Sequence, residues 1–148
     1  MIAIDTNLLV YAHRERTPQH KRARKAIERA AASSRGWGMS AAALPEFWSV
    51  VTHPSSEGGP STPAQAAAFV RALTDAGAVV WLPGPGFGER LLQTASDLAV
   101  SGPRIFDLQI ALTAFEGGAT ELWTHDGAFI TVPGLRLFDP LAHARPAV

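Results

Sequence analysis

The chain has 148 residues, of which 47% are hydrophobic and 18% are charged, and its formal net charge at pH 7 is zero. This composition excludes a disordered or collagen-like chain, and the length allows one compact core, so we expect a single domain over residues 1–148. The absence of cysteine excludes disulfides, thiolate metal sites and cysteine nucleophiles, so any metal ion must be held by oxygen or imidazole groups.

The first part of the chain predicts a strand and two helices. Residues 1–4 are rich in β-branched side chains, and Asp5 then provides a capping and turning residue before an apolar helix. Thr17 and Pro18 predict the cap and the first position of a second helix that runs to about residue 31. Its alanine and isoleucine side chains share one face and its basic side chains lie elsewhere, so this helix is expected to be amphipathic.

The middle of the chain continues the alternation of strands and helices. Residues 36–39 predict a short strand, after which Ser40 can cap a helix that carries Glu46. Pro45 leaves the start of that helix open, because proline lacks an N–H group and tends to kink or restart a helix. A threonine and a proline at residues 62 and 63 begin a further helix that ends at Gly77.

The last part predicts three strands, two helices and a tail. They are a buried strand at 78–82, helices at about 89–100 and 106–116, strands at 122–124 and 135–138, and a frayed tail at about 141–148. Strands that alternate with helices predict an α/β fold with a mostly parallel central sheet flanked by helices on both faces.

Four acidic residues fall where a parallel α/β fold binds ligands. Asp5 and Asp126 each follow a predicted strand, which places both at the C-terminal edge of the sheet. Glu46 and Asp107 lie early in helices, where unpaired N–H groups and the helix dipole favour anions. Clustered carboxylates repel one another unless a cation lies among them, and oxygen-only ligation suits Mg²⁺ or Mn²⁺. Such an ion activates water and stabilises charge that develops on phosphorus.

Each acid taken alone also fits an ordinary structural role. Asp5 and Asp107 could be helix caps, and Asp126 followed by Gly127 is a common turn pair. Glu46 could be a solvated helix residue. The pattern of all four acids together favours a site.

Four short motifs occur in a fixed order along nearly the whole chain. They are IDTNLL at residues 4–9, EF at 46–47, FDLQIA at 106–111 and LWTHD at 122–126. In this order they resemble PIN-domain ribonucleases, and the similarity, from residue 2 to about 140, is closer still to the VapC-like toxins of toxin–antitoxin pairs. Leu108, where a small residue is more usual, and Pro45 depart from the family pattern, which affects local packing more than the chemistry.

The resemblance implies an endoribonuclease that depends on Mg²⁺ or Mn²⁺, with RNA as substrate, a small antitoxin as partner and a homodimer as assembly. It carries the catalytic and metal-binding roles to Asp5, Glu46, Asp107 and Asp126. Asn7 and Thr124 match polar positions that orient a carboxylate or a water molecule.

Two other functions remain open from the residues. A haloacid-dehalogenase-like phosphatase also begins with an aspartate after a strand, but it needs a second aspartate two residues later, where this chain has Asn7. A catalytically inactive PIN-like binding module is the third possibility, although clustered acids without a function would be an electrostatic burden.

Basic residues concentrate in one segment of this neutral chain. Seven of the thirteen lysines and arginines lie within residues 14–29. They form either a solvated helix face or a track for RNA phosphates, with the candidates Arg14, Lys21, Arg22 and Lys25. The sequence shows no secretory signal and no apolar run of the roughly 18 to 20 residues that span a bilayer, so we expect a cytoplasmic protein without a membrane partner.

Overall fold

In a computed structural model that describes residues 1–142, strands alternate with helices along the chain. The strands are β1 (Ile2–Ile4), β2 (Trp37–Ser40), β3 (Val79–Trp81), β4 (Glu121–Trp123) and β5 (Arg136–Phe138). The helices are α1 (Thr6–His13), α2 (His20–Ala31), α3 (Ala43–Thr52), α4 (Pro63–Asp75), α5 (Phe87–Asp97) and α6 (Arg104–Glu116).

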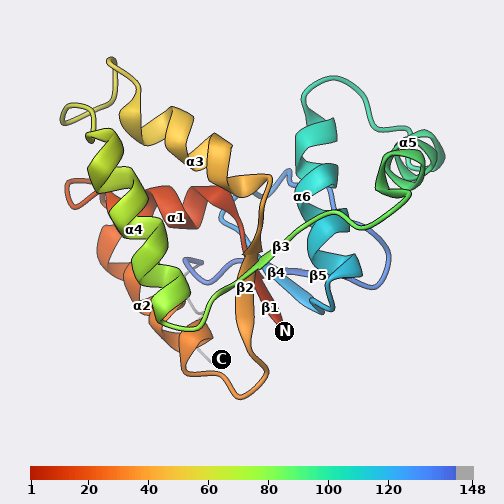
Figure 1. Cartoon of the computed structure of the whole chain (residues 1–148), viewed down its shortest axis with the longest axis horizontal. Helices are drawn as coiled ribbons and strands as arrows, with labels where there is room; N and C mark the ends of the chain where they lie inside the picture. Colours follow the sequence, from red (N-terminus) through yellow and green to blue (C-terminus); the bar gives the residue numbers. More distant parts are fainter. Residues whose placement is uncertain (143–148) are drawn as a thin grey trace, which may run out of the picture.

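All five strands form one sheet in the order β3-β2-β1-β4-β5, and every neighbouring pair is parallel. Helices α1, α2 and α4 lie on one side of the sheet and α5 and α6 on the other (Figure 1). The predicted α/β fold, with a parallel sheet flanked by helices on both faces, is confirmed. The chain runs outward from β1 through β2 to β3 and then returns to add β4 on the other side of β1. This reversal of strand order creates a crevice at the carboxyl ends of β1 and β4, where open α/β sheets bind ligands.

The core consists of the central strands and the helix faces that cover them. Strand β1 is buried throughout, as expected for a parallel strand with helices on both faces. Leu108 is fully buried in α6, so the residue that departs from the family pattern serves as a core side chain. A β-carbon at Gly38 would lie 2.2 Å from the carbonyl oxygen of Val79, so only glycine lets β2 and β3 approach this closely.

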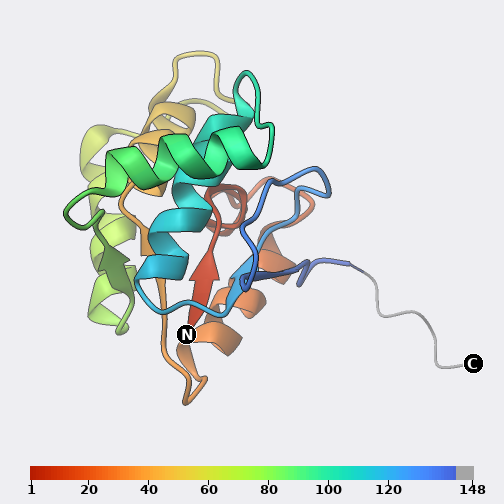
Figure 2. The ribbon, with the colours of Figure 1, turned by 90° about the vertical axis from the view of Figure 1, so that its right-hand side faces the viewer.

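Strand β3 lies at the edge of the sheet. The strand predicted at 78–82 is present as Val79–Trp81, but the prediction that it is buried holds only for Ala78 and Trp81. Val79 is 42% exposed and Leu82 is 75% exposed, because only β2 pairs with this strand. Helix α5 lies outside α6 and does not cover the edge (Figure 2). The apolar residues at 78–82 therefore predicted a strand correctly but did not predict that the strand has an exposed face.

Helices α2, α5 and α6 begin at other residues than the sequence indicated, and α5 spans Phe87–Asp97 instead of about 89–100. Helix α2 begins at His20, and the Thr17 hydroxyl donates a hydrogen bond to the Arg14 carbonyl instead of capping the helix. Helix α6 begins at Arg104, two residues earlier than predicted, so Asp107 lies within the first turn and is not the cap.

Pro45 occupies the third position of α3 without interrupting it, because N–H groups in a first turn have no helical partner. The predicted frayed tail falls mainly on residues 143–148, outside the described residues, whereas Leu141 is buried. Within the described part of the chain, no helix combines the length and the apolar character needed to cross a membrane.

Candidate functional site

Asp5 connects the central strand to the first helix and is itself almost fully buried. It follows β1 directly, caps α1 by accepting a hydrogen bond from the Thr6 amide at 2.7 Å, and is only 5% exposed. Its other carboxylate oxygen, Oδ2, accepts a 2.7 Å hydrogen bond from the Thr124 hydroxyl. Asp5 therefore serves both as the helix cap and as a candidate site residue. One carboxylate oxygen caps α1, and the other points toward the end of β4.

The Thr124 hydroxyl joins the ends of β1 and β4. Besides donating to Asp5, its oxygen accepts hydrogen bonds from the Asn7 amide nitrogen and from the backbone N–H of Asp126, both at 3.1 Å. The Asn7 side-chain oxygen in turn accepts from the backbone N–H of His125 at 3.2 Å. The hydroxyl thus uses its single donor and both acceptor positions, which fixes its orientation toward Asp5.

Asp107 and Asp126 are joined by an arginine that the sequence motifs did not identify. The Nη1 atom of Arg104 lies 2.9 Å from Oδ2 of Asp107 and 3.1 Å from Oδ2 of Asp126. The remaining oxygen of Asp126, Oδ1, accepts from the Ala128 amide at 2.9 Å, which forms the turn predicted for this aspartate. The i,i+3 spacing of Arg104 and Asp107 was a usable signal for this pair in the sequence.

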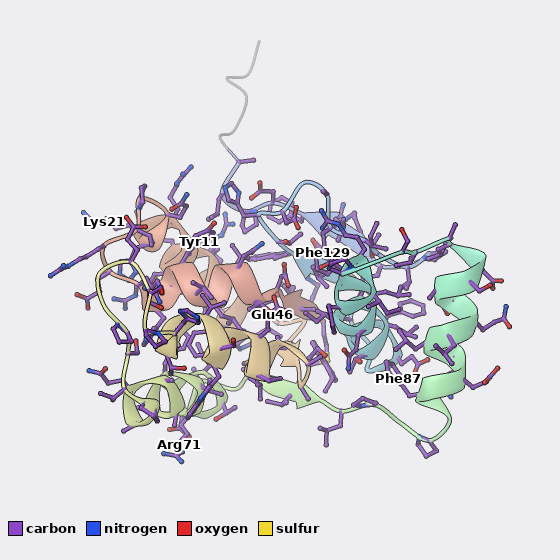
Figure 3. All side chains as sticks on the ribbon, turned by 90° about the horizontal axis from the view of Figure 1, so that it is seen from above. Tyr11, Lys21, Glu46, Arg71, Phe87 and Phe129 are labelled. Carbon is purple, nitrogen blue, oxygen red and sulfur yellow. The ribbon has the colours of Figure 1, made fainter. Side chains whose placement is uncertain are left out.

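Glu46 approaches the same region from α3. Figure 3 shows it near the middle of the molecule, between the helices on the two sides of the sheet. Partial burial and the nearby charge of Asp107 raise the pKa of Glu46, while the Thr6 hydroxyl acts against this shift. Glu46 is therefore within electrostatic reach of Asp107, although 60 residues separate the two in sequence.

The electrostatics of Asp5 are those of a carboxyl group in a crowded acidic site. Burial raises its pKa from 3.8 to about 7, against the hydrogen bonds from Thr124 and Thr6, which lower it. The charges of Glu46 and Asp107 raise it further. By contrast, the pKa of Asp126 is lowered, chiefly by the Ala128 amide and also by Arg104, although desolvation acts in the opposite direction. The acids therefore differ in protonation because of their surroundings.

The donor chemistry of the site fits a hard divalent cation. All four candidate groups offer oxygen, and Asp107 and Asp126 already share one positively charged group. No set of three aspartate, glutamate or histidine side chains within residues 1–142 converges at ligand distances. Mg²⁺ often binds through one or two carboxylates and retains several water molecules, so a partial set of protein ligands is compatible with it.

The candidate RNA-binding residues of the basic segment divide into two pairs. Arg14 donates to the carbonyl oxygens of Glu57 and Val50, and Arg22 donates to that of Leu141, so both hold loops. Lys21 and Lys25 are exposed and form no ion pair within the described residues. In Figure 3 the Lys21 side chain points outward at the periphery, away from Glu46.

His125 also has a structural role that the sequence did not indicate. Its Nδ1 atom lies 2.9 Å from a carboxylate oxygen of Asp139, and its ring packs edge-on against Tyr11. These contacts connect the loop after β4 to α1 and to the segment after β5.

The chain is also similar to known proteins over almost its full length. The family model described as the PIN domain matches residues 2–135. "VapC ribonuclease Mb2897" of Mycobacterium bovis and "Ribonuclease VapC43" of Mycobacterium tuberculosis are each 35% identical to it over 142 residues, which is 95% of this chain and 96% of theirs.

Solved structures share the fold at lower sequence identity. The crystal structure of VapC20 from Mycobacterium tuberculosis, described as a sarcin-ricin loop cleaving toxin, aligns with a TM-score of 0.67 at 15% identity, covering 87% of this chain and 92% of VapC20. FitAB bound to a DNA fragment includes a chain that aligns with a TM-score of 0.63 at 16% identity, covering 99% of this chain and all of that one. The resemblance seen in the four motifs is therefore confirmed, and the chain belongs to the PIN-domain family and, within it, to the VapC ribonucleases.

Proposed function

We propose that this VapC-family ribonuclease cleaves RNA phosphodiester bonds with Mg²⁺ or Mn²⁺ held by Asp5, Glu46, Asp107 and Asp126. The observation that supports the proposal is that Glu46 and Asp107 act on the charge of Asp5 while Arg104 joins Asp107 to Asp126, near the reversal of strand order between β1 and β4. Asp5 caps a helix and Asp126 forms a turn, yet these two roles do not require Glu46 and Asp107 to lie near them. A shared cation site gives the arrangement a single explanation.

The surrounding residues would prepare the carboxylates for the metal ion. Thr124 directs Oδ2 of Asp5, and Asn7 and the Asp126 amide fix Thr124. The bound ion would supply an activated water molecule and stabilise charge on the phosphate. Because the pKa of Asp5 is about 7 in the metal-free protein, this carboxyl group would release its proton when the cation binds. Metal binding is accordingly expected to be weaker in mildly acidic solution.

The geometry at position 7 argues against the phosphatase alternative. The Asn7 side chain donates to Thr124 and accepts from the His125 backbone, so both ends of its amide are used. A carboxylate there could not donate to Thr124. The inactive binding module is disfavoured because Asp5 remains buried with a raised pKa, an energetic cost that a site without a metal function would not need.

The function is tested by incubating structured RNAs with the purified protein in Mg²⁺, in Mn²⁺ and in excess EDTA. We expect cleavage with either metal, none in EDTA, and recovery when metal is restored. Asp107→Asn and Glu46→Gln proteins prepared in the same way should be inactive, which controls for contaminating nuclease. Cleavage that persists under full chelation, or in both variants, would rule out this mechanism.

We also propose that Lys21 and Lys25 bind RNA phosphates, since they are the candidates in the basic segment that hold no loop. Replacing both by glutamine should weaken RNA binding in EDTA for all sequences and reduce the slope of log affinity against log salt by about 1 to 2. Arg71→Gln, on exposed α4, is the control for lost charge. An unchanged slope in the double variant would assign α2 to another role.

Membership of the VapC family is the basis for two further proposals, a small antitoxin protein as partner and a homodimer as assembly. Light scattering of the purified chain, alone and after co-expression with the product of the adjacent reading frame, measures both. A monomer under all conditions would contradict the dimer, and failure to co-purify would contradict the partner.

A further inference from the structure

Arg104 occupies an unusual position for a positively charged side chain in a site expected to bind a cation. A single atom, Nη1, contacts Oδ2 of Asp107 at 2.9 Å and Oδ2 of Asp126 at 3.1 Å. A metal ion bound to these oxygens would lie about 2.0 to 2.2 Å from each. The nitrogen and the ion therefore compete for the same space between the same two oxygens.

Backbone amides also contact the two carboxylates. Oδ1 of Asp126 accepts the Ala128 amide, and the Ile130 amide also approaches Oδ2 of Asp107, at 3.4 Å. Both Oδ2 atoms therefore contact the same Arg104 nitrogen, and a position between them is already filled. An ion that bridges Asp107 and Asp126 through these two Oδ2 atoms must displace the guanidinium group.

Arg104 is also placed so that it can leave. It is the first residue of α6, its side chain is 43% exposed, and its hydrogen bonds within the described residues go to these two carboxylates. Rotation into solvent therefore breaks no side-chain hydrogen bond within the described residues other than these two, both of which the metal ion would replace. After release, a guanidinium group beside the metal would lie next to the phosphate that the metal binds, and arginine binds phosphate through paired N–H groups.

We infer that Arg104 exchanges partners during the reaction cycle: it neutralises Asp107 and Asp126 in the metal-free protein, is displaced by the divalent ion, and then binds an RNA phosphate. The inference rests on the proposed metal site. Arg104 would then be a fifth residue of the site, beside the four acids, with a role in both the metal-free and the metal-bound protein.

Two measurements test the exchange. The first is calorimetric titration of metal-stripped protein with Mn²⁺, and the second is binding of RNA in Ca²⁺ under conditions in which no product forms. Arg104→Gln should bind Mn²⁺ roughly 2- to 30-fold more tightly than wild type, because two partly exposed ion pairs contribute a free energy in this range. The same variant should bind RNA more weakly, with a salt slope lower by about 1.

Arg90→Gln is the matched control. Arg90 also forms two hydrogen bonds in an ion pair, with Glu116 at the other end of α6. The Arg90 side chain is exposed to about the same extent as that of Arg104. It removes the same charge from the protein and should leave Mn²⁺ affinity unchanged. Thermal melts in EDTA establish that the variants fold, and if Arg104→Gln does not, Arg104→Lys replaces it, with an Mn²⁺ affinity between those expected for wild type and Arg104→Gln.

The outcomes separate this inference from the proposed function. Mn²⁺ affinity that is unchanged or weaker in Arg104→Gln overturns it, because Arg104 would then support the carboxylates and not compete for them. Tighter Mn²⁺ binding with unchanged RNA binding also overturns the exchange. In both cases wild type still binds metal and cleaves RNA, so the proposed function stands. A wild-type protein that binds no Mn²⁺ overturns both.

Discussion

Replacing Asp5 by asparagine is expected to stabilise the metal-free protein at pH 8 by about 1 to 3 kcal/mol and to change its stability little at pH 5. The pKa of Asp5 is about 7 in the folded protein, against 3.8 for an ordinary aspartate. Between these values the folded state holds a proton that the unfolded state has lost. The stability of the wild-type protein therefore falls as the pH rises from about 4 to 7 and stays low above that range.

The size of the effect follows from the shift. A change of this size in pKa corresponds to at most about 4 kcal/mol at one site. The gain in stability from Asp5→Asn should be smaller. The asparagine oxygen can still accept from the Thr6 amide, but its NH₂ group cannot accept the hydrogen bond that the Thr124 hydroxyl donates to Asp5. Urea unfolding in EDTA at pH 5 and pH 8 measures the difference, with Asp75→Asn at the exposed end of α4 as control. Equal pH dependence in wild type and Asp5→Asn would show that Asp5 is ionised in the folded protein at all these pH values.

The second large effect is the loss of metal-induced stabilisation in Asp107→Asn. A ligand that binds only the folded state at about 100 times its dissociation constant stabilises a protein by about 2.7 kcal/mol. Wild type should gain stability of this order in saturating Mn²⁺, and Asp107→Asn should gain much less and lose cleavage by about 100-fold or more. In EDTA the variant loses repulsion from Glu46 and Asp5 but also the ion pair with Arg104, so its own stability should change by less than about 1 kcal/mol.

Thermal melts of both proteins in EDTA and in millimolar Mn²⁺ give the result. Asp75→Asn again serves as control, since it removes one exposed carboxylate at the end of α4 that is not among the four candidate acids. If wild type and Asp107→Asn respond equally to Mn²⁺, Asp107 is not a metal ligand. If neither responds, the metal binds too weakly to support the proposed function.

Much of the site was accessible from the sequence because its residues follow local rules. Asp5 comes directly after a β-branched strand and caps a helix, and Asp126 begins a turn after another strand, so strand direction alone placed both at one edge of the sheet. Thr124 was identified only by family resemblance, yet its three hydrogen bonds depend on groups from two ends of the chain.

The features that escaped prediction depend on which side chains meet in space. The bridge from Arg104 to Asp126 joins residues 22 positions apart and needs the first turn of α6 to face the loop after β4. The exposure of β3 depends on the order of strands, which a run of valines cannot encode. Arg14 and Arg22 resembled a charge track in sequence, but their ends reach backbone carbonyls of distant loops. The local sequence around an arginine does not show which distant backbone carbonyl its guanidinium group will contact.

The position of β1 has a consequence for the chain while it is being made. This first strand lies in the centre of the sheet and pairs with β4, and Asp5 receives its hydrogen bond from a threonine 119 residues later. A nascent polypeptide on the ribosome therefore exposes Asp5 and Glu46 long before Asp107 and Asp126 have been synthesised. Chains that stop before residue 107 contain only two of the four candidate acids, and they lack the Thr124 hydroxyl that orients Asp5. The order of synthesis therefore separates the first two acids from the last two, and the candidate site can form only late in the synthesis of the chain.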